Sequence, residues 1–201
     1  RSVYEGFMSP CRLIITRPGS LCHGLDAARL ASGISTETIF QGQRKLYNLL
    51  PDIRNAARAV IIRNEQLLLL RKEGGGRPER YALPGGGQDT GETLQQALVR
   101  ECQEEIGTTV SIDRLLFVAD FFKLRDSSPP STRHVLELMF QCSVPGDYTA
   151  TSGHHPDKHQ TGVVWMPLGE LEQVQLFPAS LGRHVIDALR GEIHSYIGII
   201  D

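Results

Sequence analysis

A run of glycines followed by a helix crowded with carboxylates constrains this chain more than any other stretch. The glycines occupy residues 85–87, and the last turns of the expected helix read RECQEEIG. A helix over residues 93–106 would place Glu101, Glu104 and Glu105 three and four residues apart, so that their carboxylates meet at one edge of its apolar stripe. Like charges at this spacing destabilise a helix. We therefore expect a group from outside the chain to compensate them.

A divalent cation is the compensating group that this pattern indicates. Mg²⁺ takes oxygen ligands, usually a few carboxylates together with substrate phosphates. Consecutive glycines let the backbone approach a ligand closely, and the Gly85 carbonyl could supply a further metal ligand. A solvated acidic helix face is the alternative, but it explains neither the glycine run nor the single arginine, Arg100, beside the acids.

Two further residues of this stretch have expected structural roles. Arg100 can pair with a neighbouring acid, most simply Glu92, and so join the loop to the helix. Gly107 ends the helix, because glycine adopts the left-handed conformation of a helix end at low cost.

The rest of the chain divides into an extension and one domain. Residues 1–55 are expected to form an N-terminal extension with a helix at 35–50, which would pack on the domain or on a second subunit of a homodimer. From residue 56 to 201 short apolar runs alternate irregularly with two helical patterns, which predicts an α/β sandwich with a mixed β-sheet. The expected strands lie at 57–63, 66–72, 81–83, 114–124, 134–144 and 163–168, the second helix lies at 180–191, and loops lie at 74–80, 127–132 and 154–162.

Composition excludes several classes of protein. Lys and Arg number 21 against 23 Asp and Glu, so no basic excess predicts bulk binding to nucleic acid. The four cysteines are far apart and form no CxxC pair, so a reducing cytoplasm is the simplest location. No apolar run reaches the length of a membrane span, and the first residues lack the pattern of a signal peptide.

The glycine-and-acid stretch closely resembles the signature of the Nudix hydrolases. That signature is Gly, five residues, Glu, seven residues, then Arg-Glu-apolar-any-Glu-Glu-any-Gly-apolar. Every fixed position is matched, by Gly86, Glu92, Arg100, Glu101, Glu104, Glu105 and Gly107. The departures, Cys102 and Thr108, fall in the apolar slots. The order of elements resembles the family over roughly residues 57–190, and LFPAS at 176–180 resembles a segment of the MutT type.

The resemblance implies a fold, a reaction and a set of metal ligands. Members share an α/β/α sandwich in which the signature forms a loop-helix-loop, and they hydrolyse a nucleoside diphosphate linked to another group. By resemblance, Mg²⁺ or Mn²⁺ is held by Glu101, Glu104 and Glu105 with the Gly85 carbonyl, and Glu101 or Glu104 orients or deprotonates the attacking water. Gly86, Glu92, Arg100 and Gly107 are then structural, with Gly86 and Gly87 also close to the substrate.

Residues outside the signature are expected to complete the site. Members often recruit a further acid, and the candidates for a general base are Glu137, on a strand, and Asp157, in the loop 154–162. Four cations in or beside the glycine-rich segment 74–80 could grip phosphates, although each could be a solvated surface cation, namely Arg71, Lys72, Arg77 and Arg80.

Two other functions stay open beside that of a pyrophosphohydrolase acting on a small nucleotide, nucleotide sugar or ADP-ribose-like substrate. One is a nucleotide-sensing module without turnover, which would be expected to have lost signature carboxylates. The other is a hydrolase of RNA 5′ ends, against which the near-neutral charge and the lack of interleaved basic and aromatic residues argue.

Overall fold

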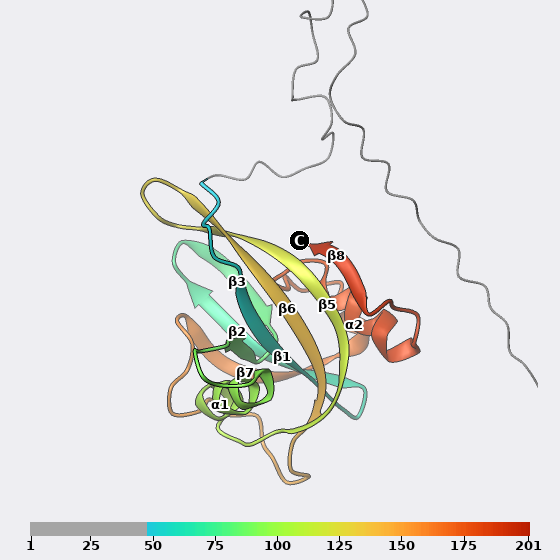
Figure 1. The fold of residues 1–201 in the computed structure, drawn as a ribbon. Coiled ribbons are helices and arrows are strands. Elements are labelled where there is room, and N and C mark those ends of the chain that lie inside the picture. The colour runs from blue at the N-terminus through green and yellow to red at the C-terminus, as the bar shows by residue number, and fades with distance from the viewer. Residues whose placement is uncertain (1–47) are drawn as a thin grey trace, which may run out of the picture. The chain divides into compact units, whose positions relative to one another are not determined.

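The computed structural model describes residues 48–201, which form strands and two α-helices (Figure 1). The strands are β1 (Arg54–Arg63), β2 (Gln66–Gly74), β3 (Arg77–Ala82), β4 (Gly85–Gly87), β5 (Ser111–Arg125), β6 (Ser131–Ser143), β7 (Gln160–Pro167) and β8 (Tyr196–Ile200). The helices are α1 (Leu94–Ile106) and α2 (Leu181–Arg190), with a single 3₁₀ turn η1 (Leu168–Glu170). Neither α-helix has the length and apolar character that crossing a membrane requires within the described residues.

The strands pair in the order β3-β2-β1-β6-β5-β8, while β4 pairs with β1 and β7 with β2. The pairs β1–β6 and β5–β8 are parallel, and the other pairings are antiparallel. The predicted mixed sheet is therefore confirmed. Its centre is β1, whose short apolar run pairs with three other strands along its length.

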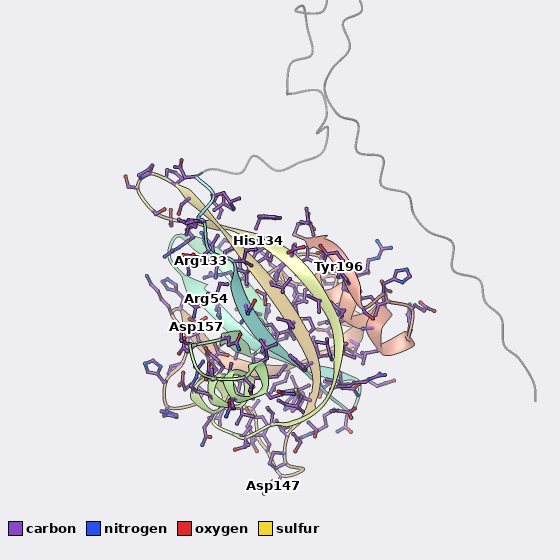
Figure 2. All side chains as sticks on the ribbon, viewed as in Figure 1. Arg54, Arg133, His134, Asp147, Asp157 and Tyr196 are labelled. Carbon is purple, nitrogen blue, oxygen red and sulfur yellow. The ribbon has the colours of Figure 1, made fainter. Side chains whose placement is uncertain are left out.

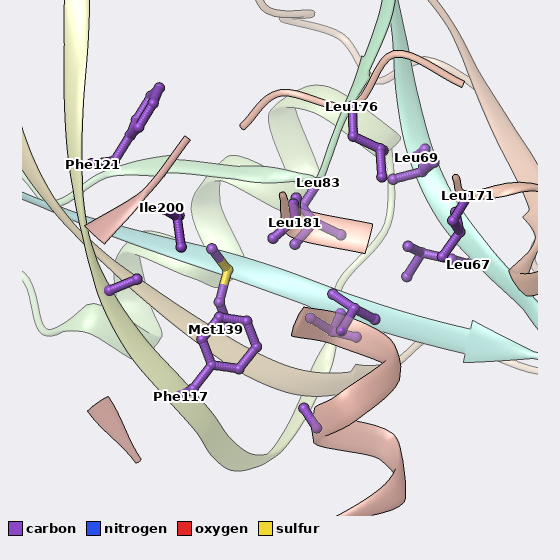
Figure 3. Packing of buried hydrophobic residues seen from close by; sticks show 14 of the residues in the cluster. Leu67, Leu69, Leu83, Phe117, Phe121, Met139, Leu171, Leu176, Leu181 and Ile200 are labelled. Carbon is purple, nitrogen blue, oxygen red and sulfur yellow. The ribbon is translucent and has the colours of Figure 1, made fainter. Parts of the chain in front are cut away.

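Alternate side chains of β1 enter two apolar clusters on opposite faces of the sheet, as the period of a strand requires. Ala56 and Val60 pack in the cluster that contains Leu181 and Val185 of α2, part of which Figure 3 shows. Ala57, Ala59 and Ile61 pack in the cluster that contains the apolar stripe of α1, Leu98, Cys102 and Ile106. Each face of the sheet thus carries one helix, which gives the α/β/α layering.

The signature helix begins and ends where its sequence predicts. Thr93 caps it: its Oγ1 accepts a hydrogen bond from Gln96 N–H at 3.2 Å, and the Gln96 side chain accepts one from Thr93 N–H at 2.8 Å. Gly107 closes it in the left-handed conformation, with φ of 68°. Local capping therefore fixes the position of the carboxylates along the chain.

Two predictions about secondary structure need correction, and one strand was not predicted. The segment 74–80 is not a long loop, because β2 continues to Gly74 and β3 begins at Arg77, leaving Gly75 and Gly76 as the turn. Most of the predicted helix at 35–50 lies outside the described residues, but its last residues are not helical, since Leu49 forms a bridge with Thr132. Strand β8 was not predicted, because its five residues follow a helix and pair with β5, far away in sequence.

Candidate active site

A cavity of about 510 Å³ opens where α1, β4 and one face of the sheet meet. All the predicted metal ligands and both candidate bases line it, namely Gly85, Glu101, Glu104, Glu105, Glu137 and Asp157. Its wall also holds cations from β1, β2, β5, β6 and the loop before β7, namely Arg54, Arg58, Lys72, Lys123, Arg125, Arg133 and Lys158. A hollow that combines carboxylates with cations suits an anionic ligand that is held partly through a metal.

Gly85 is the residue of the glycine run that contacts both β1 and α1. Strand β4 lies antiparallel to β1, with Gly85 opposite Arg58. The φ of Gly85 is +118°, and a Cβ there would lie 2.2 Å from the Ala57 carbonyl oxygen, so only glycine fits. Its N–H donates to Glu105 Oε2 at 2.8 Å, and its carbonyl accepts from the Arg58 guanidinium. The run therefore connects the sheet to the buried end of the carboxylate cluster.

Glu105 is the most deeply buried acid of the helix, with 3% of its surface exposed. Burial raises the pKa of its carboxyl to about 7, although the hydrogen bond from Gly85 and the charges of Arg58 and Lys72 act in the opposite direction. No ion pair to Glu105 forms within residues 48–201. Ionised Glu105 would therefore gain from a cation bound beside it.

Arg100 organises the exposed end of the cluster. Its guanidinium pairs with Glu92 at 2.7 Å, as predicted, and donates to the Gly87 carbonyl at 3.1 Å. The same group pairs with Glu101 at 3.0 Å and lies 3.7 Å from Glu104. The hydrogen bond from Arg100 is the main cause that lowers the pKa of Glu92, which also accepts from the Asp89 N–H. Arg100 thus holds the loop onto the helix.

The donor atoms fit a hard divalent cation. They are all oxygens, they lie along one cavity wall, and they include the buried carboxylate of Glu105. In the described part of the chain, no three His, Cys, Asp or Glu side chains already surround one point as metal ligands would. Here Glu101 and Glu104 instead face Arg100, and Glu105 faces the Gly85 N–H. Metal binding would require these carboxylates to turn toward one another.

The two candidate bases occupy different surroundings. Glu137 is 3% exposed on β6 and pairs with Arg58, whose Nε lies 2.9 Å from its Oε2. Asp157 lies in the loop before β7, pairs with Lys72 and accepts from the Lys158 N–H at 2.6 Å. Burial acts to raise the pKa of Asp157, but the charge and hydrogen bond of Lys72, the hydrogen bond from the Lys158 N–H and the charge of Arg58 together lower it. Of the nearby loop histidines only His155 lines the cavity, and it is exposed.

Several residues of the cavity wall were not predicted. Of the four cations expected to grip phosphates, Lys72 lines the cavity, and Arg71, Arg77 and Arg80 do not. Arg71 and Lys72 are adjacent on β2, so their side chains point to opposite faces of the sheet. Arg58 also lines the cavity and was not predicted. It could have been recognised as the one charge inside the apolar run of β1, because a charged side chain at such a position needs a polar partner.

Comparison with known protein families shows that residues 53–187 match the model of the NUDIX domain. YjhB of Bacillus subtilis (strain 168) is 31% identical over 106 residues, covering 53% of this chain and 47% of that protein. An ADP-ribose pyrophosphatase of Methanocaldococcus jannaschii is 30% identical over 112 residues, covering 56% of this chain and 63% of that protein. The chain therefore spans less than two thirds of the length of either relative.

Solved structures match the same fold. A crystal structure of a NUDIX hydrolase from Nitrosomonas europaea superimposes with a TM-score of 0.55 at 19% identity, covering 73% of this chain and 78% of that one. At this identity the comparison shows that the two proteins share the same arrangement of strands and helices.

Proposed function

Because the chain belongs to the NUDIX family, we propose that it is a divalent-metal-dependent hydrolase that cleaves a pyrophosphate bond. The substrate is a nucleoside diphosphate linked to another group, and one product is a nucleoside monophosphate or a sugar phosphate. The observation that carries this proposal is the single cavity lined by Gly85, Glu101, Glu104 and Glu105. A sensing module without turnover would have no use for every signature carboxylate.

Mg²⁺ or Mn²⁺ would be held by these four residues, and when bound it neutralises the pyrophosphate charge and lowers the pKa of coordinated water. The chain's own residues do the rest. Arg100 and the Gly85 N–H hold the carboxylates in place until the cation binds. Lys72, at the cavity wall, offers a positive charge to a phosphate oxygen.

Glu137 is the general base that we favour. It is buried in the cavity wall, and Arg58 bonds to both its carboxylate and the Gly85 carbonyl, so it is held beside the expected metal site. Asp157 instead lies in a loop, where it pairs with Lys72 and accepts from the Lys158 N–H. The lowered pKa of Asp157 also makes it a weaker proton acceptor than an ordinary carboxylate.

ADP-ribose is the first substrate to test, because the Methanocaldococcus jannaschii relative bears the name of an ADP-ribose pyrophosphatase. With Mg²⁺ or Mn²⁺ we expect the full chain to convert ADP-ribose to AMP and ribose 5-phosphate. Chelator should remove the activity and added metal should restore it. The measurement is AMP release followed by chromatography. Turnover that persists in excess chelator would contradict the proposal. So would the absence of turnover across a panel of nucleoside diphosphate derivatives with both metals.

Gly86→Ala is expected to reduce hydrolysis about a hundredfold with little change in thermal stability. A Cβ at residue 86 would lie 2.3 Å from Glu101 Cδ, and Gly86 does not have a positive φ. The backbone therefore accepts alanine, but the Glu101 carboxylate must move, and displacing a reacting group by about 1 Å can slow a reaction about a hundredfold.

The neighbouring variant Gly85→Ala is the matched comparison. At residue 85 the added methyl group meets backbone and φ is +118°, so this variant should lose folding stability as well as activity. Melting temperature and kcat measured for both variants separate the two effects. If Gly86→Ala unfolds as readily as Gly85→Ala, the specific contact with Glu101 is not the cause.

A further inference from the structure

Three adjacent strands carry cations on the same face at one end of the sheet. Arg133 of β6 lies directly opposite Lys123 of β5, and Arg125 follows two residues after Lys123 on β5. Arg54 of β1 lies opposite Val135, which is two residues from Arg133 on β6. Residues two apart on a strand share a face. These positions therefore bring like charges together, as Figure 2 shows for Arg54 and Arg133.

The charges of this group are poorly compensated. The side chains of Arg125 and Arg133 form no ion pair or hydrogen bond within residues 48–201. Arg54 has one distant partner, Asp89, at 3.8 Å, and both side chains are exposed. The pKa of Arg133 is lowered by burial and then by the charges of Arg125 and Arg54, while the charge of Asp52 acts in the opposite direction. Cross-strand like charges destabilise a sheet, so an anion at this place would relieve the repulsion.

The arginines connect the candidate active site to a second hollow. Arg54, Arg125 and Arg133 line both the active-site cavity and an adjoining hollow of about 740 Å³, which is otherwise formed by residues 50–55 and 88–92. Arg54 also lies against the glycine run, because a Cβ on Gly87 would come within 2.1 Å of Arg54 Nε. The glycine at this position thus makes room for the guanidinium.

The backbone of Arg125 and Arg133 lies toward the end of the sheet away from Glu137, whereas Arg54 lies beside the glycine run. Arg133 lies four residues from Glu137 on β6, which is about 13 Å along a strand at about 3.3 Å per residue. A single pyrophosphate is much shorter than that. An anion bound by Arg125 and Arg133 with their side chains extended away from Glu137 would be a group of the substrate other than the bond that is cleaved.

We propose that Arg54, Arg125 and Arg133 form a second anion site, which selects nucleoside diphosphate derivatives that carry a further phosphate outside the pyrophosphate. The inference rests on the proposed hydrolase function and adds a specificity determinant to it. The chemistry suits phosphate, since the planar guanidinium donates two parallel hydrogen bonds to it and retains its charge. The further phosphate can stand on the nucleoside or on the group at the other end, and both positions are compatible with a site shared by two hollows.

Three substrates test the proposal with the full chain and Mg²⁺. The first is ADP-ribose, the second is ADP-ribose with a phosphate on the 2′ oxygen of its adenosine, and the third is ADP-ribose with a phosphate on the 1″ oxygen of its terminal ribose. We expect kcat/KM for at least one phosphorylated analogue to exceed that for ADP-ribose by about ten- to a hundredfold, the range of one or two charge-assisted hydrogen bonds. The analogue whose kcat/KM exceeds that of ADP-ribose identifies which end of the substrate faces the arginines. In Arg125→Gln/Arg133→Gln the ratio between that analogue and ADP-ribose should fall to about one.

Arg114→Gln is the matched control. Arg114 is exposed on β5, the strand of Arg125, bonds to Gln141 at 3.0 Å and lines neither hollow. Its loss should therefore leave the ratio of kcat/KM between the analogue and ADP-ribose unchanged. Equal rates for all three substrates, or a preference that survives in the double variant, would overturn the second anion site and leave the hydrolase proposal standing. The absence of turnover of all three would overturn the second anion site, and the absence of turnover across the wider panel with both metals would overturn the hydrolase proposal as well.

Discussion

Glu105→Gln is expected to slow metal-dependent hydrolysis by about a thousandfold or more while the domain keeps its fold. Glu105 is almost wholly buried, and burial raises the pKa of its carboxyl to about 7. Glutamine retains an oxygen that can accept from the Gly85 N–H but removes the negative charge that a cation needs. A bound metal contributes several kcal/mol to transition-state stabilisation, which corresponds to about three powers of ten in rate.

In chelator at pH 8, the melting temperature of Glu105→Gln should equal or exceed that of the wild type. At that pH the wild-type carboxylate is ionised in a poorly hydrated position, and glutamine removes this burial penalty. The measurements are kcat/KM with Mg²⁺, and the melting temperature with chelator and with Mg²⁺. We expect the stabilisation by Mg²⁺ to disappear in the variant. Glu172→Gln, an exposed acid outside the cavity, is the control and should change neither quantity. A Glu105→Gln protein that is still stabilised by Mg²⁺ and still active would remove Glu105 from the metal site.

Arg58→Met is expected to lower the free energy of unfolding by about 3 kcal/mol. Arg58 bonds to the Glu137 carboxylate with two nitrogens and to the Gly85 carbonyl. Burial acts to lower the pKa of the guanidinium, but the charge and hydrogen bond of Glu137, together with the charges of Glu105 and Glu101, raise it overall. Without Arg58 the buried Glu137 carboxylate has no cation bonded to it, and breaking a buried pair in this way costs about 3–5 kcal/mol. We expect the lower end because Arg58 is partly exposed.

A double variant separates stability from catalysis. In Arg58→Met/Glu137→Leu both charges are gone, so most of the lost stability should return, since apolar replacements of buried pairs are often neutral. Activity should not return, because the proposed base is gone. Urea unfolding and AMP release measure the two quantities. A loss below about 1 kcal/mol in the single variant would mean that the pair behaves like a surface ion pair. A fully active double variant would exclude Glu137 as the base.

Local features of this molecule could be predicted from the sequence. The carboxylates of α1, the arginine that holds them and the glycine at its end all lie within one stretch, so helical spacing and capping are enough to place them. The mixed sheet and the second helix followed from apolar runs of recognisable length. The structural contacts of Glu92 and Arg100 are likewise those expected.

Features that depend on strand register could not be predicted. Arg58 and Glu137 are 79 residues apart and meet only because β1 and β6 lie parallel in one register. The same holds for Arg54 and Arg133, on the same two strands, and for Arg133 and Lys123, which face each other across β5 and β6. Arg71 and Lys72 could not be told apart as phosphate contacts, because sequence alone does not show which face of β2 borders the cavity. The metal ligands and the roles of the bases stay predictions until they are measured.

The placement of the arginines at the strand ends, away from the helix that carries the acids, has a consequence for how such a protein can diversify. In the proposed function, the carboxylates that bind the metal lie on α1, and the arginines that choose the molecule to hydrolyse lie on β1, β5 and β6. Exchanging Arg125 or Arg133 for neutral or acidic side chains can therefore redirect the protein to a differently charged compound without rebuilding its reaction centre.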